Sequence, residues 1–180
     1  KPSGFLERQV DRWMGQLSRY QTRDIPLLDK LANWLRDHRP DQVATGLMHG
    51  DYSCPNVMFA KDLPVRMAAV VDWESSTIGD PLLDLGHLLA GWCNPGETRT
   101  YLRDIDWEGM PTRDELAARY SEMTGLPIDN IEYYRALALF KLAIILEGAY
   151  SRVIKGENDY APHRTLEQRV PLFIRQAWEF

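Results

Sequence analysis

The chain has 180 residues, of which 44% are hydrophobic and 26% charged, the composition of one ordinary globular domain. Its formal net charge of -5 argues against a general nucleic-acid-binding surface, so we expect no nucleic-acid partner. No run approaches the roughly 18 consecutive apolar residues of a membrane span, so we expect no membrane partner. Two cysteines, Cys54 and Cys93, make no disulfide framework, and a cytoplasmic, reducing location is expected.

Helical periodicity dominates the start of the chain. Apolar residues follow one stripe over residues 5–20 and again over residues 25–38, and Pro40 ends the second pattern. Neither segment is β-rich, and neither contains a glycine-rich hairpin. The sequence therefore predicts two amphipathic helices ahead of the first strand.

Three short β-rich segments follow, at residues 47–48, 56–59 and 67–71. A polar loop at residues 49–55 separates the first two, and a turn at residues 61–66 separates the last two. The polar residues stand at the strand ends. This order predicts a small hairpin-like platform for a site and argues against a repeating βαβ array.

Helical patterns account for most of the remaining chain. Thr112 and Glu115 have the spacing of a capping box, which marks the start of one of these helices. The predicted helices cover residues 81–92, 112–124, 130–154 and 165–178. The expected fold class is therefore α+β and mostly helical.

The most informative polar residues lie in the middle of the chain. His49, Gly50 and Asp51 follow the first strand, Asn56 comes five residues after Asp51, and Asp72 ends the third strand. Asp51 can accept the proton of a substrate hydroxyl. Asn56 and Asp72 offer the amide and carboxylate oxygens that Mg²⁺ takes as ligands. Phosphoryl transfer mainly requires positioning and charge neutralisation, so this short set can carry much of such a reaction.

Each of these residues also has a purely structural interpretation. Asp51 could cap a turn, Asn56 could form a turn before a strand, and Asp72 could cap a strand end. Glu74 could help to organise a metal site, and it could equally be a solvated surface residue. The compound spacing, more than any one residue, favours the functional interpretation.

The compound pattern resembles the aminoglycoside phosphotransferase family, relatives of protein kinases that phosphorylate small molecules. Within that family it is most similar to the phosphotransferase domains fused to, or encoded beside, acyl-CoA dehydrogenases. The resemblance extends over most of the chain and is carried by residues 8–13, 47–56, 71–74, 76–81 and 148–152. It implies the C-terminal lobe of a protein-kinase-like fold, with the β-hairpin platform carrying the catalytic loop.

The same resemblance implies a role for each central polar residue. Asp51 becomes the catalytic base, and Asn56 and Asp72 become ligands of Mg²⁺. ATP, or another nucleoside triphosphate, becomes the phosphate donor. The acceptor becomes the hydroxyl of a small molecule, either aminoglycoside-like or a hydroxyacyl or hydroxy-acid metabolite. No substrate-binding residue can be assigned from the sequence.

Three further residues are implied to support the catalytic loop. His49 is expected to pack behind the base and to bond the backbone, and Asp84 is expected to brace the loop from behind. Asp80 is grouped with these two residues. A second interpretation fits Asp80 equally well, because a negative side chain near the start of a helix is favoured by the helix dipole.

The parts that clamp the nucleotide in kinase-like enzymes are missing from the sequence. A glycine-rich loop and a strand lysine paired with a helix glutamate are needed, and neither occurs before His49. We therefore expect residues 1–180 to form a single C-terminal lobe, whose N-terminal nucleotide-binding lobe belongs to the same protein but not to this chain. The isolated chain is expected to have little or no kinase activity.

Two alternative functions remain open from the sequence. A degenerate kinase could serve as a non-catalytic binding module. A metal-dependent phosphohydrolase could be built on His49, Asp51, Asp72 and His87, although such sites usually contain more histidine ligands.

The long predicted helix also carries polar residues whose role is open. They could face a substrate pocket, but surface positions or internal ion pairs are the favoured interpretation. These residues are Lys141, Glu147, Tyr150 and Arg152.

Overall fold

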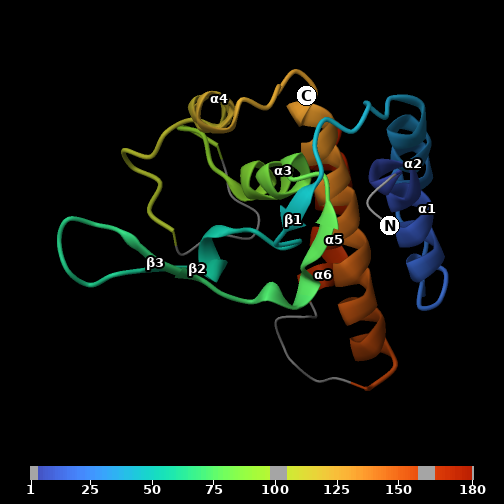
Figure 1. The fold of residues 1–180 in the computed structure, drawn as a ribbon. Helices are drawn as coiled ribbons and strands as arrows, with labels where there is room; N and C mark the ends of the chain where they lie inside the picture. The colour runs from blue at the N-terminus through green and yellow to red at the C-terminus, as the bar shows by residue number, and fades with distance from the viewer. Residues whose placement is uncertain (1–3, 98–104, 158–164, 180) are drawn as a thin grey trace.

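The computed structural model describes residues 4–97, 105–157 and 165–179 (Figure 1). The α-helices in these ranges are α1 (Phe5–Leu17), α2 (Leu28–Asp37), α3 (Leu82–Gly91), α4 (Arg113–Thr124), α5 (Ile131–Ile154) and α6 (Leu166–Gln176). The strands are β1 (Gly46–Met48), β2 (Val57–Phe59), β3 (Met67–Val70) and β4 (Thr77–Gly79), and two 3₁₀ helices are η1 (Cys54–Asn56) and η2 (Trp73–Ser75). The predicted α+β, mostly helical fold class is confirmed.

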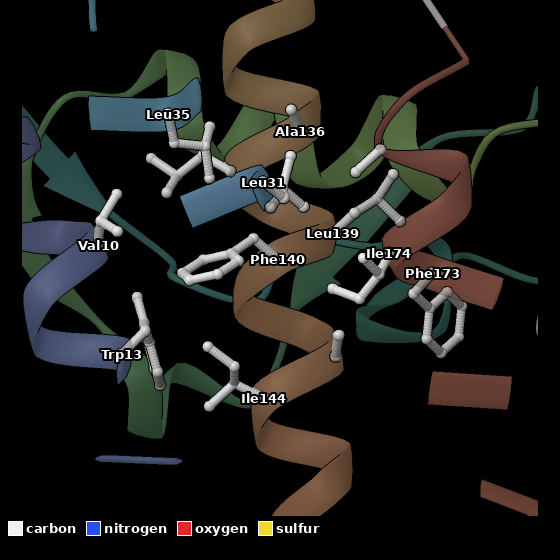
Figure 2. Packing of buried hydrophobic residues seen from close by; sticks show 14 of the residues in the cluster. Val10, Trp13, Leu31, Leu35, Ala136, Leu139, Phe140, Ile144, Phe173 and Ile174 are labelled. Carbon is white, nitrogen blue, oxygen red and sulfur yellow. The ribbon is translucent and has the colours of Figure 1, made fainter. Parts of the chain in front are cut away.

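Helix α5 forms the centre of the domain. Its side chains are apolar around most of its circumference, as expected for a helix covered on several sides. Phe140 and Ile144 of α5 pack toward Trp13 of α1, and Phe173 of α6 lies on another side of α5 (Figure 2). Helices α3 and α6 make the most extensive contacts with α5. None of the described helices combines the length and the hydropathy needed to cross a membrane.

The strands form two separate antiparallel pairs. β2 pairs with β3 to make a hairpin that projects away from the helices (Figure 1). β1 pairs with β4, with Leu47 opposite Ile78. The sequence did not predict β4, because Thr77–Gly79 is very short and ends in glycine. The platform for the catalytic loop therefore consists of both pairs.

The predicted helix boundaries differ from the observed ones mainly in the first two helices. α1 ends at Leu17 rather than residue 20. α2 begins at Leu28 rather than residue 25, because Leu27 has a φ of 67° and is not helical. The other four helices begin and end within two residues of their predicted bounds.

Gly86 sets the distance between α3 and α5. A Cβ atom at this position would lie 2.6 Å from the backbone carbonyl carbon of Tyr134 and 2.7 Å from its oxygen. A side chain larger than a hydrogen atom therefore cannot be accommodated without moving one helix. His87 follows Gly86 on α3, and Lys141 lies about two helical turns after Tyr134 on α5. The close crossing thus positions two polar side chains.

Replacing Gly86 by alanine should test this constraint. Gly86→Ala is expected to lower the free energy of unfolding by about 2 kcal/mol, the usual order for overpacking a tight core. Gly15→Ala in α1 is a matched control, because a Cβ there meets nothing within 4 Å, and alanine should raise stability by up to about 1 kcal/mol. Urea denaturation measures both. Equal stabilities for Gly86→Ala and the unmodified chain would contradict the role given to Gly86.

Candidate active site

The predicted catalytic loop runs from His49 to Asn56, between the end of β1 and the start of β2. Gly50 within it has a φ of 83°, a conformation that residues with side chains rarely adopt. A Cβ on Gly50 would also lie only 2.3 Å from the carbonyl oxygen of Ser75. Glycine is therefore required here on two grounds, and the loop passes directly against the η2 segment.

The loop is held from behind by Asp84, in the first turn of α3. The two carboxylate oxygens of Asp84 accept hydrogen bonds from the backbone N–H groups of His49, at 2.6 Å, and Gly50, at 2.8 Å. Charge-assisted bonds of this kind are stronger than neutral ones. Asp84 thus connects the first turn of α3 to the backbone of the loop.

His49 is buried, and both of its ring nitrogens are used within the protein. The backbone N–H of Asp51 donates to Nδ1 at 3.2 Å, so the ring proton belongs on Nε2, which donates to the carbonyl of Val71 at 2.8 Å. The ring also lies 4.7 Å, centroid to centroid, from that of Trp73. His49 therefore joins the loop to the end of β3, which agrees with the supporting role expected for it.

Asp51 is held by α3 as well as by its own loop. Its Oδ1 lies 3.0 Å from Nε2 of His87, a residue on α3 whose side chain is only 8% exposed, whereas the Asp51 side chain is 46% exposed. The amide nitrogen of Asn56 donates to the Asp51 carbonyl at 2.9 Å and approaches its Oδ2 at 3.4 Å. The carboxylate is fixed on one side and open on the other.

The surroundings of Asp51 favour its charged form. Burial alone raises the pKa of the carboxyl, but the hydrogen bond and charge of His87, with Lys141 and Asn56, outweigh it and hold the pKa below its usual value. At neutral pH the group is therefore a carboxylate that can accept a hydrogen bond from a substrate hydroxyl.

Asn56 and Asp72 flank the same end of the β2–β3 hairpin. The backbone N–H of Val71 donates to the carbonyl of Asn56 at 2.9 Å. This bond brings Asp72, the next residue, toward the end of the predicted catalytic loop. The Asn56 amide nitrogen faces Asp51, so Oδ1 is the atom left for a metal. Asp72 has a φ of 65° and is exposed. Among the residues that the structure describes, no side chain pairs with its carboxylate.

Asp80 is buried in the core, whereas Glu74 is exposed at the surface. The Asp80 carboxylate is fully buried and accepts hydrogen bonds from the Tyr134 hydroxyl at 2.8 Å and the Leu82 N–H at 3.1 Å. It also accepts one from the Val43 N–H at 3.3 Å. These bonds join α3 to α5 and to the segment before β1, so Asp80 does not brace the catalytic loop through them. Glu74 is exposed in η2 and lines a cavity beside the loop.

This cavity, of about 320 Å³, opens next to Gly50. It lies between α1, α5 and the η2–β4 segment, and Gly50 is part of its wall. Lys141 of α5 also lines it and donates a hydrogen bond to the Gly50 carbonyl. Burial lowers the pKa of Lys141, while the charges of Asp51 and Asp84 act in the opposite direction. Lys141 is therefore linked to Asp51 by charge and to the neighbouring Gly50 by a hydrogen bond.

Sequence reasoning placed His87 with Asp51 only in the phosphohydrolase alternative, did not predict their ion-pair contact, and left the position of Lys141 open. Both residues lie on apolar helical patterns, where a polar residue carries no sign of its partner. Glu147, by contrast, is an internal ion-pair residue, as favoured: it is fully buried, and its Oε2 lies 2.7 Å from Nη2 of Arg23. Arg23 also stacks on the Tyr150 ring, 4.2 Å from its centroid.

The geometry does not fit a metal-dependent phosphohydrolase. Both ring nitrogens of His49 are engaged, and Nε2 of His87 faces Asp51. Within the described ranges, no group of three or more His, Cys, Asp or Glu side chains is arranged to hold a metal ion. The available donors are the oxygens of Asn56 and Asp72, which suit a hard cation.

The fold and the loop define a kinase-like phosphotransferase lobe, and comparison with known proteins identifies the family. The chain belongs to the phosphotransferase enzyme family, whose model matches residues 1–119. The resemblance predicted from the central motifs is thus confirmed.

Curated relatives include two acyl-CoA dehydrogenase family members. The chain is 32% identical over 185 residues to mouse acyl-CoA dehydrogenase family member 10, covering 100% of the chain and 17% of that protein. It is 35% identical over 161 residues to human acyl-CoA dehydrogenase family member 11, covering 87% of the chain and 20% of that protein. The chain therefore spans about a fifth of the length of these relatives.

A solved structure shows the same fold. It belongs to a protein from Ralstonia eutropha described as a candidate aminoglycoside phosphotransferase. The two structures agree with a TM-score of 0.84 at 34% sequence identity, over 99% of this chain and 56% of that one. The predicted kinase-like fold is confirmed, and the chain corresponds to a little over half of the matched protein.

Removing His87 should raise the pKa of Asp51. In the His87→Ala variant, burial still raises this pKa, but the largest opposing contributions, those of His87, are gone. Because the pKa of Asp51 is lowered in the folded protein, the carboxylate adds to the free energy of unfolding at pH values above the usual aspartate pKa. This contribution is lost as pH falls through the lowered pKa. In His87→Ala the contribution should be smaller, and its loss should be complete at a higher pH.

Carbon-13 NMR of the side-chain carboxyl would follow this titration. Replacing His38, an exposed histidine at the end of α2, by alanine provides the control and should leave the Asp51 titration unchanged. An Asp51 pKa that does not rise in His87→Ala would contradict the proposed electrostatic link.

Proposed function

We propose that this chain is the acceptor-binding and catalytic lobe of a Mg²⁺-dependent enzyme that transfers the γ-phosphate of ATP to a hydroxyl of a small molecule. The observation that carries the proposal is the Asp51 carboxylate. It is half exposed, and His87 lowers its pKa. The Asn56 amide nitrogen donates to the Asp51 carbonyl, and the backbone bond from Val71 to Asn56 places Asp72 near the same end of the loop. Membership of the phosphotransferase enzyme family supports the same class of reaction.

Asp51 would orient the acceptor and take its proton. The hydroxyl donates a hydrogen bond to the carboxylate, and its oxygen attacks the γ-phosphorus as the bond to the β-phosphate oxygen breaks and ADP leaves. The hydroxyl proton passes to Asp51. Because proton transfer can occur late, the lowered pKa of Asp51 does not prevent it from acting as the acceptor.

The donors around Asp51 fit a hard divalent cation. Asn56 contributes an amide oxygen, and Asp72 contributes a carboxylate that has no partner among the described residues. One neutral and one charged oxygen leave room for the phosphate oxygens and water that Mg²⁺ usually retains. A bound Mg²⁺ would supply neutralisation of phosphate charge.

A separate nucleotide-binding lobe is part of the proposal. The chain corresponds to 56% of the matched Ralstonia protein and about a fifth of the curated relatives, so its relatives contain more than this lobe. The β2–β3 hairpin also exposes a set of large apolar side chains, which are Met58, Phe59, Leu63, Val65 and Met67. We propose that the nucleotide-binding lobe of the same protein accompanies this region.

Asp51→Asn should abolish most turnover while leaving the fold intact. In the complete protein expressed from its full reading frame, we expect kcat to fall at least about a hundredfold, because the proton acceptor is lost. Binding of Mg²⁺–ATP should persist. Asp62→Asn, in the exposed hairpin turn, is the control and should leave kcat unchanged. Near-normal phosphorylation of an acceptor panel by Asp51→Asn would refute the assignment.

Asp72→Asn should act on the metal requirement instead. Asp72 is the charged one of the two proposed metal ligands. Its loss should raise the Mg²⁺ concentration that gives half the maximal rate by about tenfold, because one carboxylate contact to the ion is lost. A magnesium titration of the rate measures this change. If Mg²⁺–ATP binds but no hydroxylated acceptor is ever phosphorylated, the non-catalytic binding module is the better description.

A further inference from the structure

We propose that Lys141 of α5 is a positioning residue for the reaction, because it fixes the peptide group that joins Gly50 to Asp51 and thereby directs the Asp51 carboxylate. This role rests on the proposed function and adds to it a residue far along the chain from the central motifs. The rate of phosphoryl transfer then depends on a lysine that acts through the backbone of the loop, without contact to ATP or the acceptor.

All four polar backbone atoms of Gly50 and Asp51 are held by side chains. These two residues belong to no helix or strand. The anchoring side chains are those of Asp84, Lys141, His49 and Asn56. Backbone N–H and C=O groups are more often paired with each other in secondary structure. The shape of the loop at Gly50 and Asp51 therefore depends on the side chains that replace those partners.

Lys141 holds one end of the peptide group that leads into Asp51. The Gly50 carbonyl and the Asp51 N–H lie in the same planar group. The carbonyl accepts a hydrogen bond from Lys141, and the N–H donates to Nδ1 of His49 at 3.2 Å. Gly50 has a φ of 83°, and glycine restrains rotation of the adjoining peptide less than any other residue. Without Lys141 only one end of the group is held, and any rotation turns the Cα–Cβ bond of Asp51 with it.

The element that carries Lys141 distinguishes it from the other three anchors. Two of these belong to the loop itself, and Asp84 belongs to the first turn of α3. Lys141 lies in α5, 91 residues after Gly50. Its ammonium lies 5.8 Å from the centroid of the Trp13 ring of α1, within the range of a cation–π contact. The central helix of the core is thus connected to the loop through a side chain that is itself held against α1.

The charge of Lys141 adds to the effect of its hydrogen bond. Burial lowers the pKa of Lys141 and Arg12 lowers it further, whereas the charges of Asp51 and Asp84 raise it. Burial raises the pKa of Asp51, and Lys141 is, after His87, among the groups that lower it. The ammonium therefore serves as a shared counter-ion for the proposed base and for the carboxylate behind the loop. A neutral side chain of similar length would retain the packing and lose both effects.

Steady-state kinetics on the complete protein would test this role. Lys141→Met has neither the charge nor the donor, so we expect kcat to fall at least about tenfold, because small misplacements of a reacting group are costly. The KM for ATP should change less than about twofold. Lys155→Met, at the exposed end of α5, is the matched control and should leave kcat unchanged. A smaller fall in kcat, or a loss that comes only from a higher KM of the acceptor, would overturn the proposal.

NMR of Asp51 supplies a readout that does not require turnover. In Lys141→Met the pKa of the Asp51 carboxyl should rise, because one of the charges that lower it is gone. The backbone N–H signal of Asp51 should also move, because its peptide group is released at the carbonyl end. Lys155→Met should change neither measurement. An Asp51 N–H signal that stays in place in Lys141→Met would overturn the proposal, whatever the titration shows.

Lys141→Gln keeps the proposal testable if Lys141→Met fails to fold. Glutamine is neutral but retains N–H donors. It should raise the pKa of the Asp51 carboxyl and lower kcat, and the loss of kcat should be smaller than in Lys141→Met where both variants fold. Urea denaturation establishes that each variant is folded. If Lys141→Gln alone is folded, an unchanged kcat or an unchanged Asp51 titration would overturn the proposal.

The two readouts separate this inference from the proposed function. If the unmodified complete protein phosphorylates no hydroxylated acceptor, the kinase assignment fails, and the NMR signals still decide whether Lys141 holds the peptide between Gly50 and Asp51. If the unmodified protein is active and Lys141→Met retains its kcat, the kinase assignment stands and the role of Lys141 is wrong.

Discussion

The close crossing of α3 and α5 is the constraint on which the site depends. At Gly86 the two helices are in direct contact, with no room for a Cβ atom. Within the described ranges, the charged groups that act on Asp51 from outside its loop come from these helices: His87 from α3 and Lys141, which bonds the Gly50 carbonyl, from α5. A wider crossing would move both groups away from the loop. The packing of the core therefore determines the electrostatic environment of Asp51.

The predicted catalytic loop combines buried support with an exposed polar edge. Asp84 and His49 use their polar atoms on backbone groups of the protein itself. Asp51 and Asp72 are supported by these contacts but remain open to solvent. Fully satisfied networks rigidify a structure, and preorganised charge is what phosphoryl transfer needs. The loop can thus be rigid where it is buried and accessible where the reaction would occur.

Much of the fold could be predicted because its signals are local. The capping box of residues 112–124 indicated a helix, and the structure shows both of its reciprocal bonds. The spacing from His49 to Asp72 predicted the family, since a loop between strands keeps its polar residues close in sequence. β4 escaped prediction because three residues ending in glycine have no periodicity to detect, and its pairing with β1 is a tertiary contact. The contacts of His87 and Lys141 escaped for a similar reason, because their partners are distant in sequence and their own helices have apolar patterns typical of a core.

The residues predicted to be catalytic and the residues that line the cavity come from different parts of the chain. The residues that would carry out the reaction lie in the central loop and at the end of β3, where family motifs are concentrated. The residues that line the cavity come largely from α1, α5 and η2. Substitutions on α1 can therefore change the charge of the cavity without altering the loop, whereas Lys141 of α5 also bonds the Gly50 carbonyl and acts on Asp51. A change of charge on α1 would thus alter a cavity next to the loop while the hydrogen bonds from Asp84 that hold the loop stay in place.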